Sequence, residues 1–216
     1  MTLSEPGGAD NDHVTDALQT LAGEIRACTA CPLHRSARQA VPGEGSAESG
    51  VLFLGEAPGY NEDVQGRPFV GAAGQLLDEL LVGIGLDRSK VFITNVVRHR
   101  PPENRDPLPD EVAACDIWFR RHLEVLAPRV VVTLGRFAMY KFLPGQSITR
   151  LHGRPQRIAG VTVFPMFHPA AALHQPSLRA DLVKDFEALR ALLATPAPAS
   201  DPKAEAPKPK QQTLFG

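Results

Sequence analysis

Cysteine, net charge and long apolar runs are all scarce in this chain. Three cysteines in 216 residues are too few for a disulfide framework. No apolar run approaches the roughly 20 residues of a membrane-spanning helix. The first residues, MTLSEPGGADNDHVTDA, have neither the basic start nor the apolar segment of a secretion signal. We therefore expect a cytoplasmic protein without a membrane partner.

The formal net charge of -1 neither indicates a polyanion partner nor excludes one. Acidic residues crowd the first stretch of the chain, whereas arginines gather in the middle. Together these arginines can form a basic face: Arg98, Arg100, Arg105, Arg120, Arg121, Arg150, Arg154 and Arg157.

Composition also divides the chain. A hydrophobic content of 43% in 216 residues suffices for the core of one domain, which we expect to span residues 16–193. Residues 1–15 are polar and Gly-rich, which predicts a disordered tail. After the domain, Pro, Ala and Lys predict an extended linker over residues 194–209, followed by a distinct terminal stretch, 210–216.

Strand-like and helix-like segments alternate along the domain. Short apolar runs, typical of strands buried on both faces of a parallel sheet, predict four strands: 51–55, 91–97, 127–135 and 161–169. Helical spacing predicts the helices around them: 17–28, 71–86, 109–126, 136–143 and 177–193. The alternation predicts an α/β fold with three α/β/α layers and a central parallel four-stranded sheet.

Unusual polar residues follow these strands. Glu56 and Glu62 come after the first strand, Asn95 ends the second, His168 ends the fourth, and Phe69 precedes the next helix. Singly, each has an ordinary explanation as a helix cap, a strand-end hydrogen bond, a core aromatic or a structural histidine. Because ligands bind beyond the carboxyl ends of parallel strands, their shared location favours a functional site.

This set of side chains suits cleavage of a base from its sugar. The amide of Asn95 offers a donor and an acceptor to a planar heterocycle, and Phe69 offers a face for stacking. His168 offers a donor to an oxygen that gains negative charge. A carboxylate can orient water or stabilise a cationic sugar.

Four stretches that carry these residues resemble the motifs of the uracil-DNA glycosylase superfamily, specifically the family-four enzymes that contain a [4Fe-4S] cluster. The stretches are GEAPGYNED, GRPFVGAAGQLLDELL, ITNVVRHRPPENRDP and FHPAAAL, and the resemblance runs in order from about Cys28 to Leu192. It implies a monomeric DNA-repair enzyme that flips deoxyuridine out of single- or double-stranded DNA. The enzyme would hydrolyse the N-glycosidic bond and leave an abasic site.

The resemblance implies residues that bind the base and the DNA. Phe69 would stack on uracil, while Asn95 and backbone groups at Gly55 and Ala57 would read its edge. Leu173 would fill the gap left by the flipped nucleotide. The loop that follows the second strand would hold DNA phosphates through Arg98, Arg100 and Arg105.

It also implies the catalytic groups. His168 would hydrogen-bond uracil O2 as the base leaves, and Glu56 or Glu62 would position water and balance the charge on the sugar. In well-studied relatives an acidic residue occupies the position of Ala57, so this chain would use a neighbouring carboxylate. Tyr60 and Glu62 are candidates for excluding thymine through a steric clash with its methyl group.

Four positions match the cluster ligands of the resembled family. Cys28, Cys31 and Cys115 match cysteines, and the remaining ligand position holds His99. Either His99 completes the iron site, as histidine does in Rieske-type centres, or the cluster is incomplete. The resemblance favours a [4Fe-4S] cluster; zinc and three free thiols are the alternatives. A histidine here also resembles a branch that is trapped covalently on its product. The chain lacks that branch's basic insertion, which predicts ordinary turnover.

The last residues become apolar again after the linker. QQTLF resembles the short motif with which bacterial repair proteins bind the sliding clamp, with Gln211, Leu214 and Phe215 as the anchors. This resemblance implies a clamp partner and a bacterial source. A chain end with chance apolar residues is the alternative.

Two other functions are compatible with parts of the sequence. One is a non-catalytic DNA-binding module with a structural metal and a clamp-binding tail; the convergence of Asn95, Phe69 and His168 argues against it. The other is a nucleotide hydrolase, but the turns contain no GxxxxGK[ST] phosphate loop.

Overall fold

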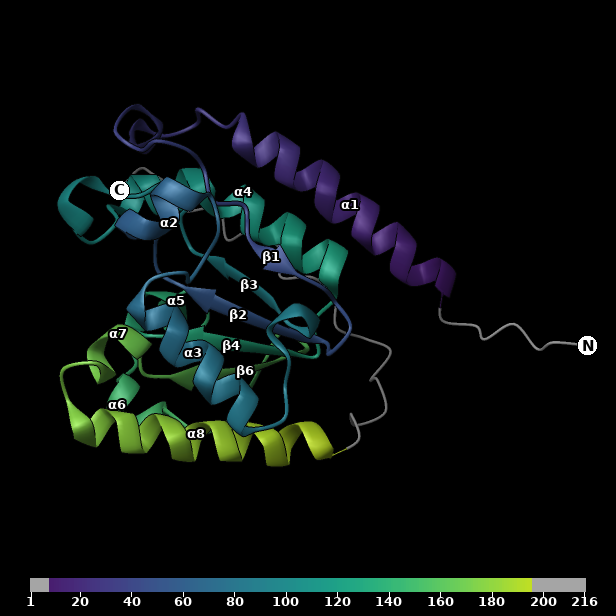
Figure 1. Ribbon diagram of the computed structural model, residues 1–216, viewed down its shortest axis with the longest axis vertical. Coiled ribbons are helices and arrows are strands. Elements are labelled where there is room, and N and C mark those ends of the chain that lie inside the picture. Colours follow the sequence, from purple (N-terminus) through teal and green to yellow (C-terminus); the bar gives the residue numbers. More distant parts are fainter. Residues whose placement is uncertain (1–7, 196–216) are drawn as a thin grey trace, which may run out of the picture.

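The structure is a computed structural model that describes residues 8–195. A sheet lies between two layers of helices, with α3 and α8 on one face and α4 and α1 on the other (Figure 1). The longer helices are α1 (Gly8–Arg26), α3 (Ala72–Gly83), α4 (Pro109–Leu126) and α8 (Pro176–Ala194). The shorter ones are η1 (Pro32–Arg35), α2 (Tyr60–Gln65), η2 (Arg88–Lys90), η3 (Pro102–Asn104), α5 (Arg136–Tyr140), α6 (Ile148–Leu151) and α7 (Pro169–Ala172).

The predicted α/β fold class and the four central parallel strands are confirmed. These strands are β2 (Val51–Gly55), β3 (Phe92–Asn95), β4 (Val130–Leu134) and β6 (Val161–Met166). The sheet has two further edge strands, β1 (Glu44–Gly45) and β5 (Gln156–Ile158), in the order β1-β3-β2-β4-β6-β5. Both edge strands pair antiparallel and are too short to leave a periodic pattern in the sequence.

The apolar runs of the strands follow from burial on both faces. In β2, Phe53 packs in the same apolar cluster as the leucines of α3 and Phe186 of α8. The next residue, Leu54, packs in the opposite cluster with Phe119 of α4. Since successive side chains point to opposite faces, a central strand covered on both sides has to be apolar at every position.

The N-terminal helix begins earlier than expected. Residues 8–15 were predicted to be a disordered tail, but α1 starts at Gly8, so that boundary is wrong. Within α1, Thr15 Oγ1 donates to Asn11 O at 2.9 Å, and residues 11–13 are exposed to solvent. The polar composition therefore reflects exposed helix rather than lack of structure. Residues 1–7 lie outside the described part.

The parallel arrangement determines where polar groups meet. The loops after β2, β3, β4 and β6 all leave from the same edge of the sheet, because these strands run in one direction. The first of these loops continues into α2 and α3, and the last into α7. Within residues 8–195, no helix is long and apolar enough to cross a membrane.

Candidate active site

A pocket of about 330 Å³ opens at this carboxyl edge of the sheet. It is built from the loops after β2 and β3 and from the start of α7. Its lining brings together most of the predicted catalytic and base-binding residues: Glu56, Ala57, Pro58, Gly59, Glu62, Phe69, Ala73, Asn95, Pro101, Asn104, Arg105, His168 and Ala170.

Three residues from two neighbouring strands and one loop form the inner end of the pocket. Gly55 ends β2 beside Asn95, its partner in β3. A Cβ added to Gly55 would contact Asn95 Oδ1 and would lie 2.6 Å from Phe69 Cζ, so only glycine leaves room for both side chains. Asn95 is 1% exposed, and its Oδ1 has no hydrogen-bond partner among residues 8–195. A buried acceptor without a partner indicates a ligand that donates to it.

The Phe69 ring forms one wall of the pocket. It is 6% exposed and faces the His168 ring, with 5.6 Å between the ring centroids and 28° between the planes. Its backbone has φ of 50°, a left-handed conformation that costs energy for a bulky residue. Its carbonyl packs directly against Gly74 of α3, where a Cβ would overlap it. The loop around Phe69 is therefore held in a conformation it would not adopt alone.

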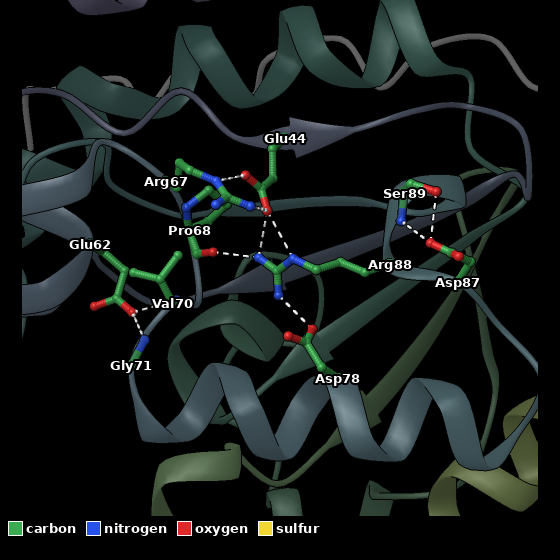
Figure 2. Close-up of polar contacts among 10 residues, drawn as sticks. All are labelled: Glu44, Glu62, Arg67, Pro68, Val70, Gly71, Asp78, Asp87, Arg88 and Ser89. Carbon is green, nitrogen blue, oxygen red and sulfur yellow. Dashed lines mark hydrogen bonds and ion pairs between the residues drawn. The ribbon is translucent and has the colours of Figure 1, made fainter.

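Glu62 holds this loop. Its Oε1 accepts from the backbone N–H of Val70 at 2.8 Å and of Gly71 at 2.9 Å, and its Oε2 accepts from Gly59 N–H at 3.1 Å. Figure 2 shows the bonds to the two residues that follow Phe69. A carboxylate that accepts three backbone hydrogen bonds is committed to the loop and has little capacity left for a water molecule.

His168 is the N-cap of α7, and its Nδ1 accepts from Ala170 N–H at 3.1 Å. Burial lowers the pKa of His168 to about 4, against the opposing effect of the Glu62 charge. The imidazole is therefore neutral at pH 7. Because Nδ1 accepts, the hydrogen bond assigns the ring proton to Nε2, which is free to donate.

Glu56 is the carboxylate that remains available. Burial and the negative charge of Asp106 raise its pKa to about 7, against the effect of Arg136. Arg136 Nη2 donates to Asp106 Oδ2 at 3.0 Å. A carboxylate that titrates near neutrality at the mouth of a pocket can act as a general base.

The pattern of polar residues at strand ends did not identify Asp106 and Arg136, although the sequence contained a signal for Arg136. Arg136 is the first residue of α5, directly after β4 and Gly135. The rule that identified the ends of the other three strands applies equally to this one.

Tyr60, a candidate for excluding thymine, is 55% exposed and does not line the pocket, so the structure gives no support to that role.

The structure contradicts one predicted DNA contact. Arg98 is 0% exposed, so it cannot reach a phosphate. Its side chain turns inward and donates from Nη1 to Asn95 O, and its backbone N–H donates to Cys115 Sγ at 3.3 Å. The charge pattern of RHRPP gave no indication that the first arginine points into the protein.

The other two arginines of this loop, Arg100 and Arg105, each have a partner in the structure. Arg105 makes two hydrogen bonds to Glu111, of 2.9 and 2.6 Å, and is engaged in the structure. Arg100 lies over the exposed ring of Tyr60, with 5.2 Å from Cζ to the centroid, and donates to Asn104 Oδ1 at 2.7 Å. Leu173 follows α7 and is 40% exposed, which places an apolar side chain on the surface near His168.

The predicted ligand residues lie on the α4 side of the sheet. Cys31, Cys115 and His99 are buried and Cys28 is partly exposed. Cys28 Sγ accepts from Trp118 Nε1 at 3.2 Å. Burial raises the pKa of Cys115, and the charges of Cys31 and Cys28 raise it further. Within residues 8–195, no three Cys, His, Asp or Glu side chains are arranged to hold one metal ion.

The surroundings of Arg98 test whether these residues fit an anionic cluster. Burial lowers the pKa of Arg98 to about 10, against the charges of Cys115 and Cys28. Among residues 8–195 no carboxylate pairs with this guanidinium; its Nη2 lies 3.2 Å from His122 Nδ1, and its Nε has no partner. A buried cation requires an anion nearby, and thiolates are the groups positioned to supply one. The donor set therefore fits a thiolate-bound group.

Comparison with known proteins agrees with the geometry. The family model of the uracil DNA glycosylase superfamily matches residues 42–193. The chain belongs to this superfamily. It is 44% identical to the type-4 uracil-DNA glycosylase of Sulfurisphaera tokodaii over 84% of this chain and 87% of that protein.

Two further relatives place the chain within the uracil DNA glycosylase superfamily. The type-4 uracil-DNA glycosylase of Archaeoglobus fulgidus is 42% identical over 85% of this chain and 96% of its own length. A type-5 uracil-DNA glycosylase of Pyrobaculum aerophilum is 34% identical over 60% of this chain and 65% of its own length. The similarity therefore assigns the chain to the type-4 branch of the superfamily.

Proposed function

We propose that this protein is a DNA-repair uracil-DNA glycosylase, a hydrolase that binds uracil-containing DNA, cleaves the N-glycosidic bond and releases uracil. The observation that carries this proposal is the unpartnered Asn95 Oδ1 beside the Phe69 ring, in a pocket that also holds a neutral His168. A planar base with an N–H next to a carbonyl matches this arrangement. A non-catalytic DNA-binding module would have no use for it.

Base recognition combines stacking with edge reading. A flipped uracil would stack on Phe69, donate from N3–H to Asn95 Oδ1, and accept at O4 from the Asn95 amide. Backbone groups at Gly55, the last residue of β2, and at Ala57, which lines the pocket, would complete the edge. The protein pays little reorganisation energy here, because burial and the Gly55 contact already fix both side chains.

Bond cleavage places negative charge on the leaving base and positive charge on the sugar. The Nε2–H of His168 would donate to uracil O2 as that oxygen becomes anionic. A neutral imidazole can fill this role, because it supplies a fixed donor without changing its protonation state. Glu56 would orient the attacking water and balance the charge on the sugar.

Glu62 has a positioning role in this mechanism. Its three backbone hydrogen bonds fix the loop that carries Phe69 and the turn at Gly59. This division leaves Glu56 as the catalytic carboxylate. Two acidic residues six positions apart thus serve different purposes because of what their oxygens contact.

A [4Fe-4S] cluster would be held by Cys28, Cys31, Cys115 and His99. The buried, carboxylate-free Arg98 and the N–H groups that donate to Cys28 and Cys115 support an anionic thiolate site. Zinc is the weaker alternative, because one ion needs all its ligands around a single point and the described residues offer no such group. When bound, the cluster would supply a structural cross-link between the segment after α1, the loop after β3 and α4.

The remaining expectations extend the proposal to DNA and to the cell. Leu173 would enter the gap left by the flipped nucleotide, and Arg100 would contact phosphate at the pocket rim. The catalytic domain would end near residue 193. The structure describes only residues 194–195 of the predicted linker, 194–209. The proposed clamp-binding residues also lie outside the described part: Gln211, Leu214 and Phe215.

The test is release of uracil from a labelled single-stranded oligonucleotide without added magnesium. We expect the wild type to excise uracil. His168→Ala should be about 100- to 1,000-fold slower, as expected for loss of one donor to a developing anion. Glu56→Gln should lose catalysis with little change in stability, whereas Glu62→Gln should lower stability as well, because it disrupts loop hydrogen bonds.

Asn95→Ala should lose affinity for free uracil, measured by product inhibition. Asn61→Ala is the matched control, because that amide is exposed on α2 and does not line the pocket. A wild type that leaves uracil in place with its metal site intact would favour the DNA-binding module instead.

A further inference from the structure

The segment from Arg67 to Gly71 carries Phe69 and is anchored at both ends. On its C-terminal side, Glu62 accepts from the N–H groups of Val70 and Gly71. On its N-terminal side, the carbonyl of Pro68 accepts from Arg88 Nη2 at 2.5 Å. The peptide units before and after Phe69 are therefore each tied to a charged side chain, as Figure 2 shows.

Arg88 lies at the centre of the N-terminal anchor. Besides Pro68 O, its Nε donates to Glu44 Oε1 at 2.8 Å and its Nη1 donates to Asp78 Oδ1 at 2.7 Å. These three acceptors belong to the loop, to edge strand β1 and to α3 (Figure 2). The side chain of Arg88 is only 19% exposed, so the contacts are partly shielded from solvent.

Glu44 keeps the guanidinium in this orientation. Its carboxylate also accepts from Arg67 Nε at 2.7 Å and so joins both ends of the network. Burial alone would raise the pKa of Glu44, but Arg67 and Arg88 together hold it below its ordinary value. The carboxylate is therefore charged at neutral pH and attracts both arginines.

We propose that Arg88 is a positioning residue for base stacking, and that its bond to Pro68 O keeps Phe69 in the left-handed conformation that presents its ring to uracil. This inference rests on the proposed function. Arg88 belongs to η2, which precedes β3 and so lies toward the edge of the sheet opposite the pocket. It does not line the pocket and acts only through the loop.

The chemistry of the site requires arginine. Three acceptors in three different elements need a planar group with several fixed donors, which a guanidinium provides. A lysine ammonium at this position has the charge but reaches fewer of the acceptors at once. Arg88→Lys should therefore restore part of what Arg88→Gln loses.

The experiment measures kcat and KM for uracil excision, together with inhibition by free uracil, for Arg88→Gln and Arg88→Lys. Displacing a stacking ring by about 1 Å can reduce the rate up to about 100-fold. We expect Arg88→Gln to lower kcat at least tenfold with a nearly unchanged KM for DNA, and to weaken inhibition by free uracil in proportion. Arg88→Lys should fall between this variant and the wild type.

Arg179→Gln is the matched control. Arg179 lies in α8 and donates to Glu79 of α3, the helix that also carries Asp78, at 2.9 Å. Within residues 8–195 it makes no hydrogen bond to the Phe69 loop. The kcat and uracil inhibition of this variant should equal those of the wild type. Thermal unfolding of all variants separates a loss of stacking from a general loss of stability.

Two results would overturn the inference. One is an Arg88→Gln variant that keeps the wild-type kcat and uracil inhibition. The other is a variant that melts earlier yet shows the same kinetics per folded molecule, which would make the network purely structural. If the wild type itself releases no uracil, the proposed function fails, and this inference fails with it.

Discussion

At the scale of single residues, the two carboxylates after β2 differ in what surrounds them. Glu62 is occupied by three backbone N–H groups, whereas Glu56 has a pKa raised to about 7 by burial and by Asp106. If Glu56 acts as the ionised base, activity should rise as pH increases through about 7. His168, with a pKa of about 4, stays neutral across this range and contributes no second step.

Asp106→Asn should move this rise to lower pH. The substitution removes the negative charge that raises the Glu56 pKa and frees Arg136, whose positive charge lowers it. Both effects favour the ionised form of Glu56, so the acid limb of the kcat profile should shift toward lower pH while its plateau changes little. The measurement is kcat against pH from 5 to 9. An acid limb that stays in place would mean that another group controls it.

Residue-level prediction from the sequence succeeded where a general rule applied. Asn95, Phe69, Glu56 and His168 meet because parallel strands end at one edge, and this follows from the order of the elements. It failed for Arg98, since a pattern of charged letters does not tell which side chain points inward. The sequence also could not show which of Glu56 and Glu62 has oxygens available for water. That depends on which backbone N–H groups each carboxylate contacts, and every residue except proline has such a group.

At the scale of elements, the four central strands were predictable because they are buried on both faces and therefore apolar throughout. The short strand β1 was not, since its two residues have no period. Yet β1 carries Glu44, which orients Arg88 behind the Phe69 loop. The part of the site that sequence reasoning missed is thus the support behind the pocket, which depends on contacts between distant segments.

The loop after β3 joins the proposed cluster ligands to the pocket. Arg98 donates through its backbone to Cys115 Sγ and through its guanidinium to the carbonyl of Asn95. Arg98→Met should therefore reduce iron and sulfide bound per protein molecule. It should also lower the stability of the cluster-loaded protein by about 3 to 5 kcal/mol, as expected if the guanidinium and the cluster thiolates form a buried ion pair.

Chemical iron and sulfide analysis and thermal unfolding measure these effects without reference to activity. Arg120→Gln is the control, because Arg120 lies on the exposed side of α4 and pairs only with Asp116. An Arg98→Met protein with full iron content and unchanged unfolding would show that the buried cation does not balance the proposed cluster.

At the scale of the whole molecule, the expected basic face is weaker than the arginine count suggests. Arg98 is buried, and ion pairs engage Arg105 with Glu111, Arg120 with Asp116 and Arg121 with Glu24. Among residues 8–195, this leaves four arginines of the predicted face outside ion pairs, Arg100, Arg150, Arg154 and Arg157, in a chain with a formal net charge of -1. The affinity of the domain for DNA should therefore be modest, and its dependence on salt should be shallow, because few phosphate contacts release few counterions.

A protein of this kind gains most from a second attachment to DNA. If Leu214 and Phe215 bind the bacterial sliding clamp, this attachment would raise the effective concentration of the enzyme near loaded DNA without new contacts in the domain. The double substitution L214A/F215A should leave excision from a bare oligonucleotide unchanged. A clamp loaded on primed DNA should stimulate excision by the wild type, and the double substitution should remove this stimulation. A second attachment of this kind can raise apparent affinity about 100-fold or more. Thr213→Ala, between the proposed anchors, should retain the stimulation. Stimulation that survives L214A/F215A would assign clamp binding to another part of the chain, and equal loss in Thr213→Ala would contradict the assignment of anchors.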